Sequence, residues 1–93
     1  MRAIWNGVTL AESDQTVVVE GNHYFPPESL NRDALVGSHT TSTCPFKGNA
    51  NYVTAQAGGA VNADAGWYYP QPNPGYEQIT NHVAFWRGVE VVP

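Results

Sequence analysis

The chain has 93 residues, of which 42% are hydrophobic and 12% aromatic, which is enough for one small domain, residues 1–93, with a single core. Its formal net charge is −4 with only four lysine and arginine residues, which excludes a basic face for nucleic-acid phosphates or anionic lipid headgroups. The single cysteine excludes an internal disulfide and a multi-cysteine zinc site, and together with the lack of a signal-peptide pattern or long apolar run it predicts a cytoplasmic protein without membrane contact.

The first part of the chain has the composition of short antiparallel strands. Asn6-Gly7 separates two apolar segments and predicts a hairpin with a type I′ turn, because both residues tolerate positive φ. The β-branched run Val17–Val19 predicts a strand buried on both faces, so we expect a meander of three strands. A proline at the first helical position predicts a helical turn from Pro27, continued as far as Leu35.

The rest of the chain alternates apolar segments with turn signals. The polar segment Gly37–Thr43 is expected to be a loop. Strands are predicted after it at Asn51–Ala55, Ala60-Val61, Trp67–Tyr69, His82–Trp86 and Val89–Val92. The total of about seven to eight short, mainly antiparallel strands predicts an all-β fold, a sandwich, barrel or bent pair of sheets, with one or two short helical turns.

The segment Thr41–Gly48 holds the chain's only cysteine, Cys44, and its only lysine, Lys47. A thiol beside an ammonium is a candidate nucleophile or redox group. The alternative is a buried, inert cysteine with the lysine at the surface, because free cysteine is among the most buried residue types. Both interpretations stay open at the level of the sequence.

Glu20 follows directly on the apolar run Val17–Val19. Burying a carboxylate without a partner is costly, so Glu20 either faces water or meets a partner such as Lys47 or Tyr24. In the second case it is a candidate proton-transfer or ligand-binding group.

Three large aromatic residues stand together at Trp67–Tyr69. In a strand, Trp67 and Tyr69 share one face and Tyr68 points to the other. They either fill the core or wall a cleft, since ligand pockets are often lined by aromatic residues. Taking charge, hydroxyl groups and ring faces together, we predict one concave ligand-binding pocket lined by Glu20, Tyr24, Cys44, Lys47, Trp67 and Tyr69, with Cys44, Lys47 and Glu20 as catalytic candidates.

No metal site or cofactor is predicted. The three histidines, His23, His39 and His82, are scattered and do not form a recognisable ligand set. The chain has no glycine-rich phosphate loop, no dinucleotide-binding motif and no His-Glu-x-x-His helix. A Cys-His-Asp triad stays open, because such residues meet in space rather than in sequence.

Five motifs together resemble those of a small bacterial family, the domain of unknown function numbered 427, which is also filed as nucleotidyltransferase-like. They are Ala3–Gly7, Val19–Pro26, Thr43–Gly48, Ala65–Pro70 and Val83–Trp86. The resemblance covers nearly the whole chain and implies a compact all-β domain similar to the β-tent group. Some members of that group bind zinc through paired cysteines, which this chain lacks. The paired strand aspartates and Gly-Ser helix start of nucleotidyltransferases are also missing.

Three functions are compatible with these features. The first is a domain that binds a small polar or nucleotide-like ligand in an aromatic-lined pocket. The second is an enzyme that uses Cys44 as a nucleophile or redox thiol, or a nucleotidyltransferase-like enzyme as the resemblance implies. The third is a structural or interaction module, with exposed aromatic residues in a homodimer patch. The sequence is compatible with a monomer or a homodimer.

Overall fold

The computed structural model describes all 93 residues as an all-β domain with nine strands and two 3₁₀ turns, η1 and η2. The strands are β1 Arg2–Trp5, β2 Val8–Glu12, β3 Val17–Val19, β4 Asn22–Tyr24, β5 Leu35–Cys44, β6 Gly48–Ala57, β7 Ala60–Tyr68, β8 Ala84–Phe85 and β9 Glu90–Val92. The helical turns are η1 Pro27–Ser29 and η2 Glu77–Ile79. The predicted all-β class is confirmed, with one strand more than the upper estimate. No helix in the structure has the length and apolar character needed to cross a membrane.

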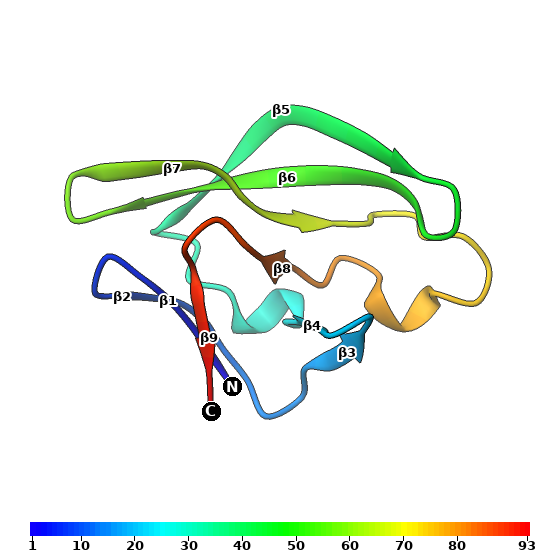
Figure 1. The fold of residues 1–93 in the computed structure, drawn as a ribbon, viewed down its shortest axis with the longest axis horizontal. Helices are drawn as coiled ribbons and strands as arrows, with labels where there is room; N and C mark the ends of the chain where they lie inside the picture. The colour runs from blue at the N-terminus through cyan, green and yellow to red at the C-terminus, as the bar shows by residue number, and fades with distance from the viewer.

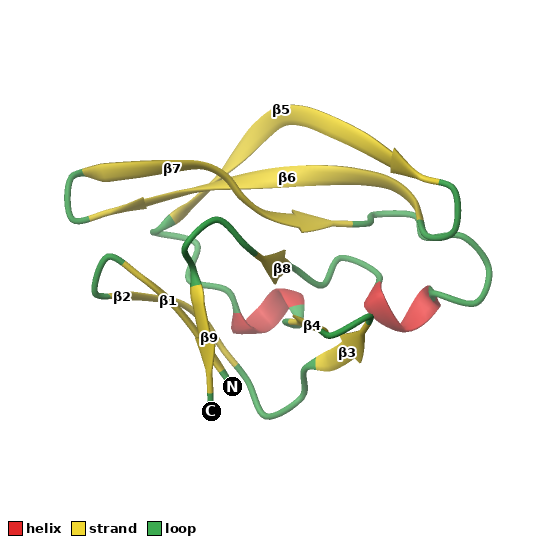
Figure 2. Ribbon diagram, viewed as in Figure 1, coloured by secondary structure: helices red, strands yellow, loops and turns green.

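Three antiparallel sheets have the strand orders β2-β1-β9, β3-β4 and β5-β6-β7-β8. Strands β5 to β7 are long and arch over the short sheets, and both helical turns lie on the covered side of this arch (Figures 1 and 2). Phe25 and Val83 exchange two backbone hydrogen bonds, at 2.8 and 2.9 Å. These bonds join the end of β4 to the start of β8, so the two-stranded and four-stranded sheets form one bent surface.

The bent surface has a different core on each face. One face packs on the sheet β2-β1-β9 through a cluster that includes Leu10, Phe25 and Phe85. The other face carries a second cluster that includes Tyr24, Tyr69 and Ile79. Residues next to each other in the chain, such as Tyr24 and Phe25, belong to opposite clusters, because side chains in a strand alternate between faces. This alternation places the aromatic residues of the second cluster around the site described below.

Hairpin turns with two left-handed residues set the strand register. Asn6-Gly7 links β1 to β2 with φ values of 51° and 76°, as the type I′ prediction requires. Glu20-Gly21 links β3 to β4 with φ values of 52° and 79°. Asn6 is of a type that often adopts the left-handed conformation, whereas Glu20 is not, and Glu20 is one of the predicted site residues.

The prediction for Val17–Val19 is wrong in two respects. Strand β3 pairs only with β4, so it does not continue the first hairpin as a meander. Its central residue, Val18, is 56% exposed, so the strand is not buried on both faces. A run of β-branched residues suits a strand that is buried on both faces as well as one that is exposed on one face, and only the strand pairing decides which faces are covered.

Two segments differ from the predicted loop and helix. Gly37–Thr43 lies inside β5 and is not a loop; its polar side chains face solvent on an edge strand. The helical turn from Pro27 does not reach Leu35, because the chain is extended at Leu30, with φ −82° and ψ 138°. Asn31 then donates a side-chain hydrogen bond to the Thr9 carbonyl at 3.0 Å, an interaction that competes with a helix.

The last two predicted strands exist but are shorter and do not pair with each other. Strand β8 covers only Ala84–Phe85 and pairs with β7. Strand β9 pairs with β1, so the two ends of the chain lie side by side (Figure 1). Arg87-Gly88 therefore carries the chain from one sheet to another.

Candidate functional site

One hollow of about 340 Å³ lies where the β3–β4 turn, the β5–β6 turn and strands β6 and β7 meet. We call it the aromatic hollow, and it is lined by Glu20, Asn22, Tyr24, Lys47, Tyr52, Trp67, Tyr69 and Trp86. Five of the six predicted site residues are among these eight. The sixth, Cys44, is not.

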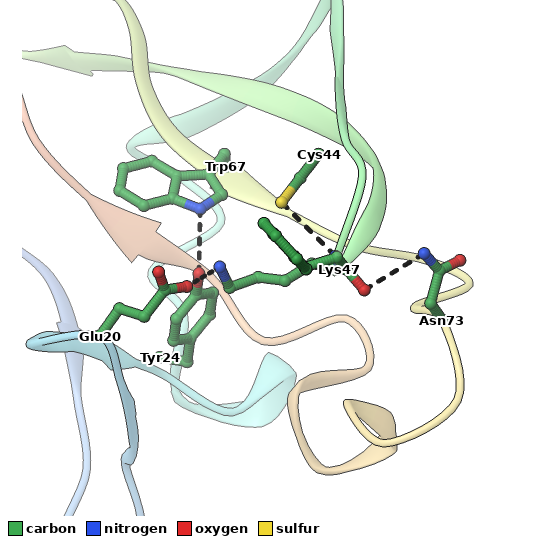
Figure 3. Close-up of polar contacts among 7 residues, drawn as sticks. Glu20, Tyr24, Cys44, Lys47, Trp67 and Asn73 are labelled. Carbon is green, nitrogen blue, oxygen red and sulfur yellow. Dashed lines mark hydrogen bonds and ion pairs between the residues drawn. The ribbon is translucent and has the colours of Figure 1, made fainter.

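Lys47 is held in place through its backbone as well as its side chain. Its N–H donates to the sulfur of Cys44 at 3.4 Å, and its carbonyl accepts the N–H of Asn73 at 2.8 Å. The ammonium forms an ion pair with the carboxylate of Glu20 (Figure 3). The Lys47 side chain is only 10% exposed, and its nitrogen lies 5.7 Å from the centre of the Tyr76 ring. A buried ammonium is stable here because it has a carboxylate and a ring face as partners.

Glu20 approaches the lysine from the opposite side of the hollow, on the first position of the β3–β4 turn. Its backbone is left-handed, a conformation that costs a residue with a Cβ on the order of 1 kcal/mol relative to glycine. Its side chain is 66% exposed, so only one end of the ion pair is buried. The turn therefore holds a carboxylate over the hollow at some cost to stability, where asparagine or glycine would fit the backbone better.

Trp67 and Trp86 form a corner of the hollow. Their ring centres are 5.5 Å apart and their planes meet at 72°. Trp67 donates its indole N–H to the Tyr24 hydroxyl at 3.2 Å, and Trp86 donates to the carbonyl of Asp64 at 2.6 Å. Tyr52 completes this wall, with its ring centre 6.4 Å from that of Trp86. Because both indole N–H groups are already bonded, these walls offer ring surface to a ligand rather than hydrogen-bond donors.

The two buried tyrosines add neutral hydroxyl groups. Burial raises the pKa of Tyr69 to about 12, and the nearby Tyr24, Cys44 and Tyr52 contribute to the same shift. Burial also raises the pKa of Tyr24, although the hydrogen bond from Trp67 partly opposes this. Both phenols therefore keep their protons at neutral pH, where they can bind polar groups but do not carry charge.

Asp64 anchors the wall that carries Trp86. This residue of β7 also has a left-handed backbone, and its carboxylate accepts hydrogen bonds from Ser38 at 2.6 Å and Thr40 at 2.8 Å. These two bonds lower the pKa of Asp64, and the charge of Arg87 acts in the same direction. The Asp64 carboxylate thus ties β7 to β5 across β6, while the backbone carbonyl of the same residue accepts the indole N–H of Trp86.

Cys44 lies behind the hollow rather than in it. Its thiol is half-buried, is not part of a disulfide, and packs against the cluster that contains Tyr24 and Tyr69. The contact with the Lys47 N–H uses the sulfur as an acceptor. The sequence therefore located the correct turn, but the ammonium of that turn reaches the hollow and the thiol does not.

Sequence reasoning missed Asn22, Tyr52 and Trp86. Tyr52 is the cross-strand partner of Trp67, a relation that appears only when the pairing of β6 with β7 is known. Trp86 lies two residues after Ala84, a member of the second cluster, so the alternation of the predicted strand His82–Trp86 was a signal for its position. Asn22 directly follows the turn Glu20-Gly21 and lines the hollow together with Glu20.

A second hollow, of about 480 Å³, lies on the other face of the bent surface. Its lining includes Val53 and Tyr68, the chain neighbours of Tyr52 and Trp67. The remaining lining residues are Pro27, Leu30, Arg32, Leu35, Val36, Gly37, Asn81 and Val83. Four of the ten lining residues, Leu30, Leu35, Val53 and Tyr68, belong to the margin of the first core cluster. The guanidinium of Arg32 is exposed and bonded to a carbonyl. No buried charge faces this hollow, so the aromatic hollow is the stronger candidate.

The histidines do not gather at either hollow. The Nδ1 atom of His23 lies 2.9 Å from the Thr16 hydroxyl, and that of His82 lies 2.9 Å from the Thr80 carbonyl, while His39 is exposed on β5. The structure contains no group of three or more histidine, cysteine, aspartate or glutamate residues arranged to hold a metal ion.

Comparison with known proteins identifies the family. The family model described as "Domain of unknown function (DUF427)" matches residues 1–92. Because this match covers almost the whole chain, the protein belongs to that family, as its motifs indicated. No curated protein matches the chain.

Proposed function

We propose that this DUF427 domain binds a small polar or nucleotide-like molecule in the aromatic hollow. The observation that carries the proposal is the position of Lys47. The only lysine of the chain is nearly buried, and its ammonium lies beside aromatic rings and pairs with a carboxylate on a left-handed residue. Burying the lysine and holding the glutamate in a left-handed conformation both cost stability, and apolar residues in place of the ion pair would often serve the fold as well or better. Costly features that meet at one hollow support a functional role there.

The size and lining of the hollow set the size of the ligand. Its volume of about 340 Å³ is near the lower end of the range of roughly 300–1,000 Å³ for small-molecule sites. The ring surfaces of Tyr52, Trp67 and Trp86 suit an apolar or flat part of the molecule. The Glu20–Lys47 pair and the tyrosine hydroxyls suit a polar part on the same ligand.

The enzyme alternative has less support. A nucleophile has to reach the substrate, whereas Cys44 is outside the lining of the hollow and its sulfur accepts the N–H of Lys47. A nucleotidyltransferase-like reaction would place substrate phosphates on a cation, and the only cation in the lining is already paired with Glu20. An interaction module is the remaining alternative, with Phe46 and Trp86 as its exposed aromatic residues.

A thermal-shift screen against metabolites, nucleotides and nucleoside triphosphates with magnesium tests the proposal. A ligand that binds only the folded state raises the melting temperature in a concentration-dependent manner. We expect Trp86→Leu to abolish the shift, because it removes one wall of the hollow. Phe46→Leu is the matched control, since this aromatic residue is 71% exposed and lies outside the lining.

Cys44→Ala separates binding from thiol chemistry. The binding proposal expects this variant to keep the ligand-dependent shift, because the thiol does not line the hollow. A variant that folds but no longer responds to the ligand would support the enzyme alternative. No stabilising compound in a broad screen would argue against the binding function itself.

We also propose that the protein works in the cytoplasm, binds no nucleic acid and acts as a monomer or homodimer. The free thiol of Cys44 and the net charge of −4 support the first two statements. Cell fractionation and sedimentation velocity would test location and oligomeric state.

A further inference from the structure

The walls of the aromatic hollow are ring faces with few free donors. The indole N–H groups of Trp67 and Trp86 are bonded inside the protein, and the Tyr52 hydroxyl lies 2.9 Å from the Ser42 hydroxyl. These walls offer the electron-rich surface of three rings, in which the ring centre of Trp86 lies 5.5 Å from that of Trp67 and 6.4 Å from that of Tyr52. Ring faces of this kind attract cations.

The charges of the hollow favour the same kind of ligand. Glu20 and Lys47 are the only charged residues in the lining. The Lys47 side chain is largely buried, whereas the Glu20 side chain is largely exposed and only one of its oxygens, Oε1, contacts the ammonium. The carboxylate therefore belongs to the more accessible of the two charged side chains. The chain as a whole is also negative, with a formal charge of −4.

One of these rings already interacts with a cation of the protein. The guanidinium carbon of Arg87 lies 4.7 Å from the centre of the Trp86 ring, within the distance of about 6 Å at which cation–π attraction operates. Arg87 does not line the hollow, so it leaves the hollow itself open.

We infer that the aromatic hollow takes a compact organic cation, a methylated ammonium group of the trimethylammonium kind, with the rings of Tyr52, Trp67 and Trp86 around the charge and Glu20 as counter-ion. A primary ammonium would bring three N–H donors that ring faces leave unsatisfied, whereas methyl groups pack on these faces. The inference rests on the proposed binding function and narrows it to one ligand class.

Isothermal titration with two probes of the same shape tests the inference. Choline carries the charged nitrogen, and 3,3-dimethylbutan-1-ol has a carbon in its place. The hollow should bind choline at least about tenfold more tightly than the neutral analogue, because only choline gains cation–π and carboxylate attraction. High salt should narrow this difference, since part of it is electrostatic.

Two variants locate the effect in the hollow. Trp86→Leu should weaken choline binding at least about tenfold. Phe46→Leu is the control and should bind choline as tightly as the wild type. Trp86 is 43% exposed, so the variant should fold. Glu20→Gln should weaken choline binding while leaving the neutral analogue unaffected, provided that its melting curve shows a folded protein.

Three other outcomes of the titrations would refute the cation inference, and the last of them would also refute the proposed binding function. Equal affinity for both probes would refute the cation inference and leave an apolar binding site, so the proposed function would stand. Binding of adenosine monophosphate or inorganic phosphate but not of choline would also refute it, and would assign recognition to Lys47. If none of these probes and no compound of the wider screen binds, both the inference and the proposed function fail.

Discussion

Removing Glu20 should destabilise the protein more than removing the charge of Lys47, although the two residues form one ion pair. The reason is the difference in exposure, since the lysine side chain is 10% exposed and the glutamate side chain 66%. In Glu20→Gln the ammonium of a largely buried side chain loses its counter-ion. In Lys47→Met the carboxylate turns to solvent and the apolar stem is kept.

The structure sets the expected size of each effect. Breaking a fully buried pair costs about 3–5 kcal/mol, and because one end of this pair is open to water we expect about 1.5–2.5 kcal/mol for Glu20→Gln. Lys47→Met should cost less than about 1 kcal/mol, close to a surface pair. Lys47→Ala also removes the buried stem and should cost about 1–2 kcal/mol. The double variant Glu20→Gln/Lys47→Met should be about as stable as Lys47→Met alone.

Urea unfolding followed by tryptophan fluorescence measures these differences. A domain of this size is expected to unfold in two states, and unchanged m-values would show that only stability has changed. The double-mutant cycle should give a coupling energy of about 1.5–2.5 kcal/mol, equal in size to the cost of Glu20→Gln, because the double variant is expected to match Lys47→Met. The reasoning is refuted if Glu20→Gln costs no more than Lys47→Met and the coupling is below about 0.3 kcal/mol, as for an exposed pair.

Three further predictions concern the fold and its titrating groups. Gly66→Ala should cost at least about 2 kcal/mol, because its Cβ would lie 2.9–3.0 Å from atoms of neighbouring strands; Gly37→Ala, with nothing within 4 Å, should change stability by less than about 0.5 kcal/mol in the same urea assay. The lowered pKa of Asp64 means that its carboxylate stabilises the fold above its ordinary pKa of 3.8 and that this contribution is lost as the pH falls below that value, so Asp64→Asn should flatten the acid limb of the stability curve. The raised pKa of Tyr69 means that the wild type loses stability as the pH rises from 10.0 to about 12, because in this range the phenol ionises in the unfolded state but not in the folded state. Tyr69→Phe should lose less stability than the wild type in that range. Absorbance titration of the wild type should show one phenol that titrates later than the others. An unchanged acid limb for Asp64→Asn, or phenols that all titrate together near 10, would contradict these two statements.

Local features of the fold could be predicted where one or two residues decide the backbone. The Asn6-Gly7 turn is such a case, because few other residue pairs adopt two positive φ values so readily. The opposite faces of Trp67 and Tyr68 followed from the alternation of side chains in a strand. Long-range pairing could not be predicted in this way. The contact of β9 with β1 joins the two ends of the chain, and no short sequence pattern encodes it.

The same distinction explains the candidate site. The sequence left two options for Glu20, water or a partner such as Lys47, and the structure combines them, because the side chain is 66% exposed and its carboxylate pairs with Lys47. Tyr52 and Trp86 were missed, because they reach the hollow through the pairing of β6 with β7 and of β7 with β8. Cys44 was placed at the correct turn but on the wrong side of it. The direction of a side chain at the end of β5, next to a three-residue turn, depends on contacts that only the folded structure defines.

Fluorine NMR of protein labelled with 5-fluorotryptophan tests the binding claim most directly, because the chain has three tryptophans and only Trp67 and Trp86 line the hollow. The third, Trp5, lies on β1 and packs against the other core cluster, so it serves as an internal control. In a titration with the compound that stabilises the protein most, the signals of Trp67 and Trp86 should shift together and saturate with one dissociation constant, while the Trp5 signal stays in place. A ligand that raises the melting temperature but leaves Trp67 and Trp86 unmoved would contradict the assignment of function to the aromatic hollow.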